Sequence, residues 1–371
     1  MIPELPRIPA VDPGLLDAYA RAHGILEGAR QDADPQLDLV FRRFAIETSC
    51  EAIAGIPPTF RTGALPPLLP APRAFLSARD LARIDGIRAA VQYLDSRLAM
   101  VAQGHDAVSL RSESPFVLHA LAEGRVDNPQ VTNPGMIRAT EVQQAAGMFT
   151  FPPPVEVRAL FEDAVNIANS APGPACARAA WLMYATIFIH PFCDGNGRVA
   201  RLLYLLVAGA ELPAGVDWGV AEQWSARREA FTYSGPCHAL DAALDLTPLV
   251  AFVTRASADG AALMRKRLEV LEELRRGYAR RVPEAQDVLA AVTLTRRRVA
   301  TADVIAADLG QPYAETLDQL RALDAVGLLR RVPSPPSRRR AGPSRPAFAL
   351  SAEATAVATS VVTRATLTAT D

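Results

Sequence analysis

Lysine is almost absent from this sequence. Lys266 is the only lysine among 39 basic residues, and 40 acidic residues nearly balance the basic ones. We interpret the shortage of lysine as a bias of overall composition, because alanine and proline are abundant as well. A net charge of −1 excludes a protein that is drawn as a whole to nucleic acid or to an anionic membrane. Any such attraction must be local.

Long apolar runs are also lacking, and cysteine is scarce. The most apolar stretch, 202–210, is interrupted by Glu211 and is far shorter than the roughly 20 residues that span a bilayer. It predicts a buried helix, and we expect no membrane partner. A secretory signal has a basic flank followed by an apolar segment, and the start of the sequence lacks this arrangement. We therefore expect a cytoplasmic protein. The four cysteines give no grounds for a disulfide framework or a zinc site, because none forms a CxxC pair: Cys50, Cys176, Cys193 and Cys237.

What the sequence does contain is helical periodicity along most of its length. Its 371 residues, half of them hydrophobic, predict two or three domains. The fold class we predict is mostly α, because apolar residues recur at helical spacing in the segments 37–56, 78–100, 115–123, 154–170, 175–189, 197–210 and 248–280. One short β-hairpin is expected at Phe149-Thr150-Phe151, where a polar residue separates two aromatic ones.

The last third of the chain has a different pattern. Three short helices are predicted at 283–294, 301–309 and 314–329, and a strand is predicted at 347–350. Three helices followed by a strand, a loop and a strand form the outline of a winged helix-turn-helix domain. The residues from 351 onward contain few large apolar side chains and are expected to form a tail.

Charge in this C-terminal module is uneven. The segment 330–345 contains no acidic residue and is suited to contact phosphates, because it carries Arg330, Arg331, Arg338, Arg339, Arg340 and Arg345. The candidate recognition helix has Arg321 as its only base and would repel a DNA backbone, because it also carries Glu315, Asp318 and Asp324. We favour protein interaction or homodimer formation for this module, followed by weak DNA contact and then by sequence-specific regulation.

The densest group of chemically useful residues lies between two predicted helices, where residues 190–201 read HPFCDGNGRVAR. Gly195 and Gly197 permit backbone conformations that other residues avoid. Asn196 tolerates similar conformations and adds an amide. The next helix begins near Gly197, so its unpaired N–H groups and its dipole favour an anion. The loop 195–197 is therefore a candidate phosphate site.

The side chains around this loop suit phosphate transfer. Arg198 and Arg201 lie three residues apart, so one helical turn places both on the same side, as a polyphosphate would require. Asp194 offers a hard oxygen ligand for Mg²⁺ beside the phosphates. His190 can act as a general base, since its usual pKa is about 6.5. A lone histidine or a lone Asn-Gly pair would indicate a core residue or a turn, but the whole set within twelve residues predicts one site.

This stretch resembles the signature HPFxDGNGRxxR of the Fic (filamentation induced by cAMP) family, and all nine fixed positions match. The segment Gly135-Met136-Ile137-Arg138 is similar to the family's Gly-x-x-Arg, and prolines at 152–154 match those before its next helix. The resemblance extends over about residues 36–265. It implies a helical fold whose hairpin flap binds a target segment by β-strand addition.

The resemblance also implies a protein adenylyltransferase that uses ATP and Mg²⁺. His190 would take the proton from a Ser, Thr or Tyr hydroxyl, on another protein or on the chain itself, as that hydroxyl attacks the α-phosphorus of ATP. Asp194 would hold Mg²⁺. The main chain of 195–197, with the amide at 196, would bind the α-phosphate, and Arg198 and Arg201 would bind the β- and γ-phosphates. Pyrophosphate would leave.

One feature of many family members is missing. These proteins restrain themselves with a helix whose glutamate pairs with the second arginine of the motif. The corresponding segment here is 53–56, in which Ala54 occupies the glutamate position. Arg201 is therefore expected to lack its inhibitory partner, unless Glu47 or Glu51, on the same helix, replaces it.

Together these observations predict a helical region at 1–110, a catalytic core at 111–265, a connecting helix at 266–282, a winged-helix domain at 283–350 and a tail at 351–371. Two alternatives to AMP transfer stay open. The same site can transfer another nucleotide or phosphate-linked group, because the motif contacts phosphates and not the base. Alternatively, the chain is a DNA-binding regulator whose Fic-like part senses a ligand.

Overall fold

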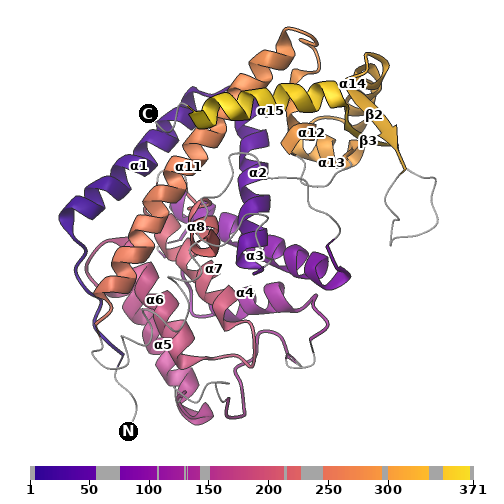
Figure 1. The fold of residues 1–371 in the computed structure, drawn as a ribbon. Helices are drawn as coiled ribbons and strands as arrows, with labels where there is room; N and C mark the ends of the chain where they lie inside the picture. Colours follow the sequence, from indigo (N-terminus) through magenta and orange to yellow (C-terminus); the bar gives the residue numbers. More distant parts are fainter. Residues whose placement is uncertain are drawn as a thin grey trace. The chain divides into compact units, whose positions relative to one another are not determined.

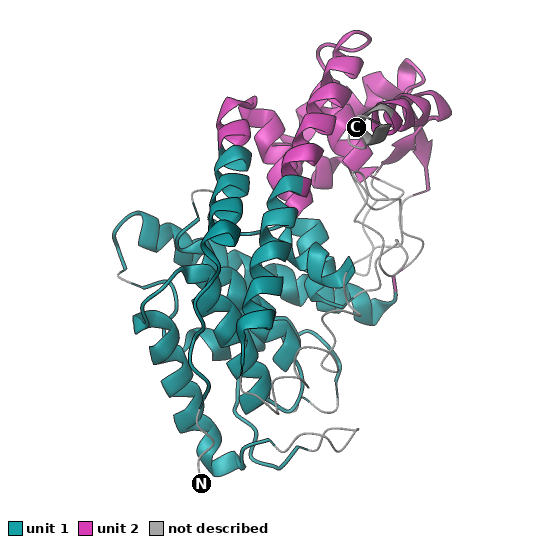
Figure 2. Cartoon of the chain, turned by 60° about the vertical axis from the view of Figure 1, so that its left-hand side comes forward, with its two compact units in different colours: residues 1–27, 46–66, 77–262 teal, residues 28–45, 67–76, 263–371 magenta. Residues whose placement is uncertain are grey.

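The computed structural model is mostly helical, with one small sheet (Figure 1). The residues that it describes are 5–55, 76–106, 108–128, 131, 133–142, 151–212, 215–226, 245–294, 300–333 and 346–367. Every helix among them is too short or too polar to cross a bilayer. The chain divides into two compact units, shown in different colours in Figure 2.

The first unit comprises 1–27, 46–66 and 77–262. Its complete helices are α3 (Ala78–Ala102), α4 (Ser114–Glu123), α5 (Pro154–Ser170), α6 (Ala175–Ile189), α7 (Asn196–Gly209) and α8 (Val220–Ala226). The predicted bounds of α5 and α6 are confirmed residue for residue. Helices α6 and α7 pack together, α5 contacts α6, and both α3 and α4 contact α7. Nearly all side chains of α6 and α7 are buried, 202–209 included, so these two helices form the core of the unit.

Three helices contribute residues to both units: α1 (Pro13–Asp32), α2 (Pro35–Ile53) and α11 (Thr247–Ala279). Helix α1 lies in the region 1–110 that was expected to be helical, but its own bounds were not predicted, because its apolar periodicity is weak and only His23 and Leu26 are buried along it. Its start nevertheless follows ordinary capping rules. The carboxylate of Asp12 accepts a hydrogen bond from the main-chain N–H of Leu15 at 2.9 Å, and Pro13 occupies the first helical position.

The second unit comprises 28–45, 67–76 and 263–371. It contains the helices α12 (Gln286–Leu294), α13 (Ala302–Leu309), α14 (Tyr313–Ala325) and α15 (Ala352–Leu367). Its strands β1 (Ala300–Thr301), β2 (Leu329–Val332) and β3 (Ala347–Leu350) form an antiparallel sheet in the order β1-β3-β2. The three predicted helices and the strand at 347–350 are confirmed, but the third helix, predicted at 314–329, ends at Ala325, and Leu329 begins β2. The winged-helix assignment stays a prediction.

One segment differs from expectation, and two other predictions are not tested. Residues 351–371, expected to form a tail, include helix α15, because Ala354, Ala358 and Val361 recur at helical spacing and are buried. Two further predictions fall outside the described residues: most of the hairpin at 149–151, and the arginines of the segment 334–345.

Candidate active site

The motif forms the connection between α6 and α7, with His190 as the residue that ends α6. His190 adopts a left-handed backbone conformation (φ 51°), which is costly for a residue with a Cβ and occurs at no other non-glycine residue among those described. Arg138 holds it there. This buried guanidinium donates from Nε to the carbonyl of His190 at 2.7 Å, and other nitrogens bond the carbonyls of Ile189 and Pro152. The main-chain N–H of Arg138 also bonds the carbonyl of Pro191.

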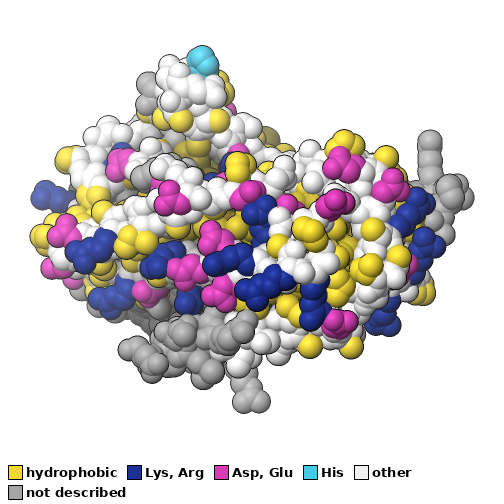
Figure 3. Space-filling view, turned by 90° about the horizontal axis from the view of Figure 1, so that it is seen from above, with side chains coloured by type: hydrophobic (Ala, Val, Ile, Leu, Met, Phe, Trp, Pro, Cys, Tyr) yellow, Lys and Arg dark blue, Asp and Glu magenta, His cyan; other side chains and the backbone are white. Residues whose placement is uncertain are grey.

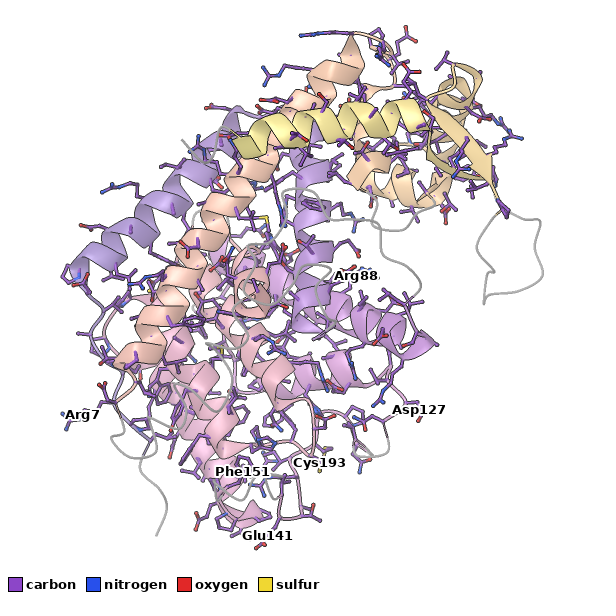
Figure 4. All side chains as sticks on the ribbon, viewed as in Figure 1. Arg7, Arg88, Asp127, Glu141, Phe151 and Cys193 are labelled. Carbon is purple, nitrogen blue, oxygen red and sulfur yellow. The ribbon has the colours of Figure 1, made fainter. Side chains whose placement is uncertain are left out.

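The imidazole of His190 is arranged as a base. Its Nδ1 lies 3.3 Å from the carbonyl oxygen of Ile187. Because a carbonyl only accepts, Nδ1 must carry the proton, which leaves the lone pair on Nε2. Burial and then the nearby charge of Arg138 lower the pKa of His190. The ring of Phe151 packs on it with 4.2 Å between ring centroids (Figure 4, where Phe151 and the loop residue Cys193 are labelled). His190 is therefore neutral near pH 7 and can accept a proton.

The loop that follows is closed by Asn196. Its Oδ1 accepts a hydrogen bond from the main-chain N–H of Phe192 at 2.9 Å, and its Nδ2 donates to the carbonyl of the same residue at 2.8 Å. The side-chain amide is buried and engaged in holding the loop. The first turn of α7 still leaves the main-chain N–H groups of Asn196 and Gly197 without an acceptor inside the helix. An anion would meet these N–H groups rather than the amide of Asn196.

Asp194 is ionised and partly open to solvent, with its side chain 38% exposed. Its carboxylate accepts from the N–H of Gly195 at 2.6 Å and from Nδ2 of Asn128 at 2.8 Å. Burial alone would raise the pKa of Asp194, but the bond from Gly195 and the charge of Arg198 outweigh burial, and its pKa lies below the usual value. The carboxylate can therefore offer a charged oxygen to a ligand.

The two arginines of the motif are held differently. Arg198 donates from Nε to the carboxylate of Glu123, and one Nη lies 3.4 Å from Asp194. Arg201 donates from Nη to the carbonyl of Ile53 at 3.1 Å, so the C-terminal end of α2 lies beside it. Both arginines therefore lie on the first turns of α7, beside the loop 195–197, where Glu123 and Asp194 balance part of their charge.

Three comparisons agree on the relatives of this region. Residues 113–208 match the family model described as Fic/DOC family. This chain contains a Fic/DOC domain. The chain is 32% identical over 134 residues to "Protein adenylyltransferase fic-1" of Caenorhabditis elegans, a match that covers 35% of this chain and 25% of that relative. A Fido domain-containing protein of Dictyostelium discoideum is 61% identical over 31 residues, 8% of this chain and 22% of that protein.

The fold of the Fic domain also occurs in a solved structure. A Fic family protein from Desulfovibrio desulfuricans aligns over 94% of this chain and 99% of its own, with a TM-score of 0.50 and 19% identity. The curated relatives from C. elegans and D. discoideum are much longer than the parts that align, since this chain spans about a quarter of their length.

Magnesium fits this Fic domain together with a phosphate ligand. Asp194 supplies one ionised carboxylate, and Mg²⁺ is commonly bound by one or two carboxylates plus phosphate oxygens and water. Among the described residues, no three His, Cys, Asp or Glu side chains come together to hold a metal by themselves. The donor set therefore suits a metal that arrives with a phosphorylated substrate.

The motif brings its own residues together, but part of the Fic site comes from residues that the sequence analysis did not single out. On α4, the ring of His119 stacks on Phe192, and Glu123 pairs with Arg198. Asn128 holds Asp194. The sequence pattern of α4 could have revealed two of these residues. His119 and Glu123 lie four residues apart in a helix that is otherwise largely apolar, so they share one face.

Proposed function

We propose that this protein is an adenylyltransferase, which transfers AMP from Mg-ATP to a hydroxyl group of a protein. The observation that carries the proposal is a neutral His190, with Nε2 available, in the loop that leads into the N-terminus of α7 and its two arginines. The choice of AMP over other groups rests on the relative named protein adenylyltransferase fic-1. Transfer of another nucleotide remains the alternative, because a site of this kind contacts phosphates.

In the proposed reaction, Nε2 of His190 takes the proton of the target hydroxyl while its oxygen attacks the α-phosphorus of ATP. The bond between that phosphorus and the oxygen bridging to the β-phosphate breaks, and pyrophosphate leaves with the electron pair. The N–H groups at the start of α7 would stabilise charge on the α-phosphate, and Arg198 and Arg201 charge on the leaving phosphates.

Asp194 would hold Mg²⁺, which when bound neutralises phosphate charge. Asn196, whose amide closes the loop, would contribute through its main-chain N–H. Arg138 would keep Nε2 in place by fixing the backbone of His190.

The proposal is tested by incubating the protein, alone and with cell lysate, with Mg²⁺ and ATP labelled in the α-phosphate. We expect label on the protein itself or on a lysate protein, and we expect His190→Ala to abolish it. His105→Ala is a suitable control, because His105 lies outside the motif, in the connection between α3 and α4. Equal labelling by the wild-type and His190→Ala proteins would refute the role of His190.

A further inference from the structure

Glu123, the last residue of α4, is a charged side chain that is fully buried. Its carboxylate is 0% exposed, and Oε1 accepts from Nε of Arg198. The other oxygen, Oε2, is buried as well and meets no hydrogen-bond donor among the described residues. A buried carboxylate is costly unless a cation compensates it, so Glu123 depends on Arg198.

The same side chain packs against the glycine of the anion loop. A Cβ added to Gly195 would lie 2.9 Å from Oε1 of Glu123 and 3.0 Å from its Cδ and Cγ. Residue 195 must therefore be glycine for two reasons, because its φ of 84° also disfavours other residues. Glu123 thus contacts both the loop that would receive a phosphate and the arginine that follows it.

The guanidinium of Arg198 is held on two edges. Nε bonds Glu123, one Nη approaches Asp194 at 3.4 Å, and the side chain is 14% exposed. The other Nη makes no hydrogen bond to a described residue and remains for a ligand. An arginine that is already oriented loses less conformational entropy when it binds a phosphate.

We propose that Glu123 is a positioning residue of the anion site. Glu123 holds the Nε edge of Arg198, so that the open Nη group of Arg198 meets a phosphate of ATP. This inference rests on the proposed function, since it assumes that the site binds phosphates. It adds a residue outside the motif, on a different helix, that acts on ligand affinity through Arg198.

The test is a double-mutant cycle on the full chain. The dissociation constant for inorganic pyrophosphate in the presence of Mg²⁺ is measured by calorimetry. Glu123→Met should weaken binding about tenfold or more, because Arg198 loses a charged partner. Glu123→Gln should stay within about threefold of wild type, because its amide oxygen can still accept from Nε. In an Arg198→Met background, Glu123→Met should change the dissociation constant less than about twofold.

A matched control is Asp106→Leu, which removes the carboxylate of a partly buried pair of the same unit, between Asp106 and Arg97, outside the motif. It should leave pyrophosphate binding unchanged. If Glu123→Met does not fold, Glu123→Asp tests the proposal instead. The aspartate side chain is one methylene shorter, so its carboxylate reaches Arg198 less well. The Asp variant should weaken binding about threefold or more, and only when Arg198 is present.

The proposal fails if Glu123→Met, or Glu123→Asp in its place, leaves affinity unchanged, or weakens it equally with and without Arg198. It also fails if the wild-type protein does not bind pyrophosphate. The proposed function is tested separately by label transfer from ATP. A protein that binds pyrophosphate but transfers no label would refute the transferase, while the dissociation constants would still decide the role of Glu123.

Discussion

At the scale of single residues, the base of the site owes its properties to its neighbours. The carbonyl of Ile187 selects the tautomer of His190, and Arg138 fixes its backbone. The tautomer of His119 is also set by its hydrogen bonds. Its Nδ1 accepts from the N–H of Gly135 at 2.7 Å, so its Nε2 carries the proton and donates to the carbonyl of Asp194 at 3.0 Å. His119 must be neutral to make both of its bonds, because Nδ1 accepts and Nε2 donates.

The pH dependence of transfer should follow from the lowered pKa of His190. Burial and Arg138 lower this pKa from 6.5, so the base is unprotonated at pH 7 and gains a proton only at lower pH. The rate of label transfer should therefore be level around pH 7 and decline with a midpoint below 6.5. Stability changes with the same sign, since the unfolded chain binds more protons below pH 6.5. A decline with a midpoint above 6.5 would contradict this.

Ala54 cannot itself supply an inhibitory carboxylate, and Glu51, buried on helix α2, stays the candidate to replace it. Helix α2 ends beside Arg201, which bonds the carbonyl of Ile53, and Glu47 is engaged elsewhere in an ion pair with Arg88 at 2.8 Å. Ala54→Glu would add a carboxylate next to the bonded carbonyl and should lower self-labelling about tenfold by pairing with Arg201. Ala54→Gln, of similar size and uncharged, should lower it less. Unchanged self-labelling in Ala54→Glu would count against this placement of the helix.

Some of the site was predictable from the sequence and some was not. The motif residues are adjacent in the chain, so their proximity at the start of α7 followed from one helix boundary. His119 and Glu123 precede the motif by about seventy residues, and their contacts depend on how α4 packs on α7. The side-chain amide of Asn196 was assigned to a phosphate, but nothing in the sequence showed that Phe192 would engage both of its polar atoms.

At the scale of secondary-structure elements, the start of α7 depends on glycine at 195. Gly195 and Gly215 of the first unit have similar φ angles, 84° and 79°, but of these two only Gly195 lies against another side chain. Gly215→Ala should lower the free energy of unfolding by about 1–2 kcal/mol, the cost of a Cβ in this conformation. Gly195→Ala should lower it further, because its Cβ meets Glu123. Urea denaturation measures the free energy of unfolding of both variants. Equal losses of this free energy would show that Glu123 moves aside freely.

The elements that were predicted share a clear apolar face. Helices α5 and α6 pack against each other, and prolines mark where each begins, so their bounds were readable. Helix α1 buries two residues in twenty, and α15 is built mainly of alanine, threonine and valine. Strand β1 has two residues and exists only because β3 pairs with it. Such elements depend on tertiary contacts, which the spacing of apolar residues in the sequence does not reveal.

At the scale of the whole molecule, the 39 basic and 40 acidic residues nearly balance. Basic and acidic side chains are interspersed on the face shown in Figure 3, in keeping with a net charge of −1. In the second unit, Arg321 of α14 pairs with Asp318 at 3.2 Å, and Arg331 of β2 lies 3.7 Å from Asp324. These pairs leave little free positive charge on α14 for a nucleic acid.

We therefore expect at most weak binding of random duplex DNA, lost at physiological salt, when it is measured by gel shift. Any such binding should depend on residues 338–340, and replacing these three arginines by glutamine should remove it while label transfer continues. A shift that persists at physiological salt and disappears with the same three substitutions would favour the DNA-binding regulator instead.

The most direct test of the central claim compares two labels in one experiment. The protein is incubated with Mg²⁺ and with ATP labelled either in the α-phosphate or in the γ-phosphate, and protein-bound label is measured for the wild type and for His190→Ala. Transfer of AMP predicts label from the α-position only, and none with His190→Ala. Label from the γ-position, or α-label that survives loss of His190, would contradict it.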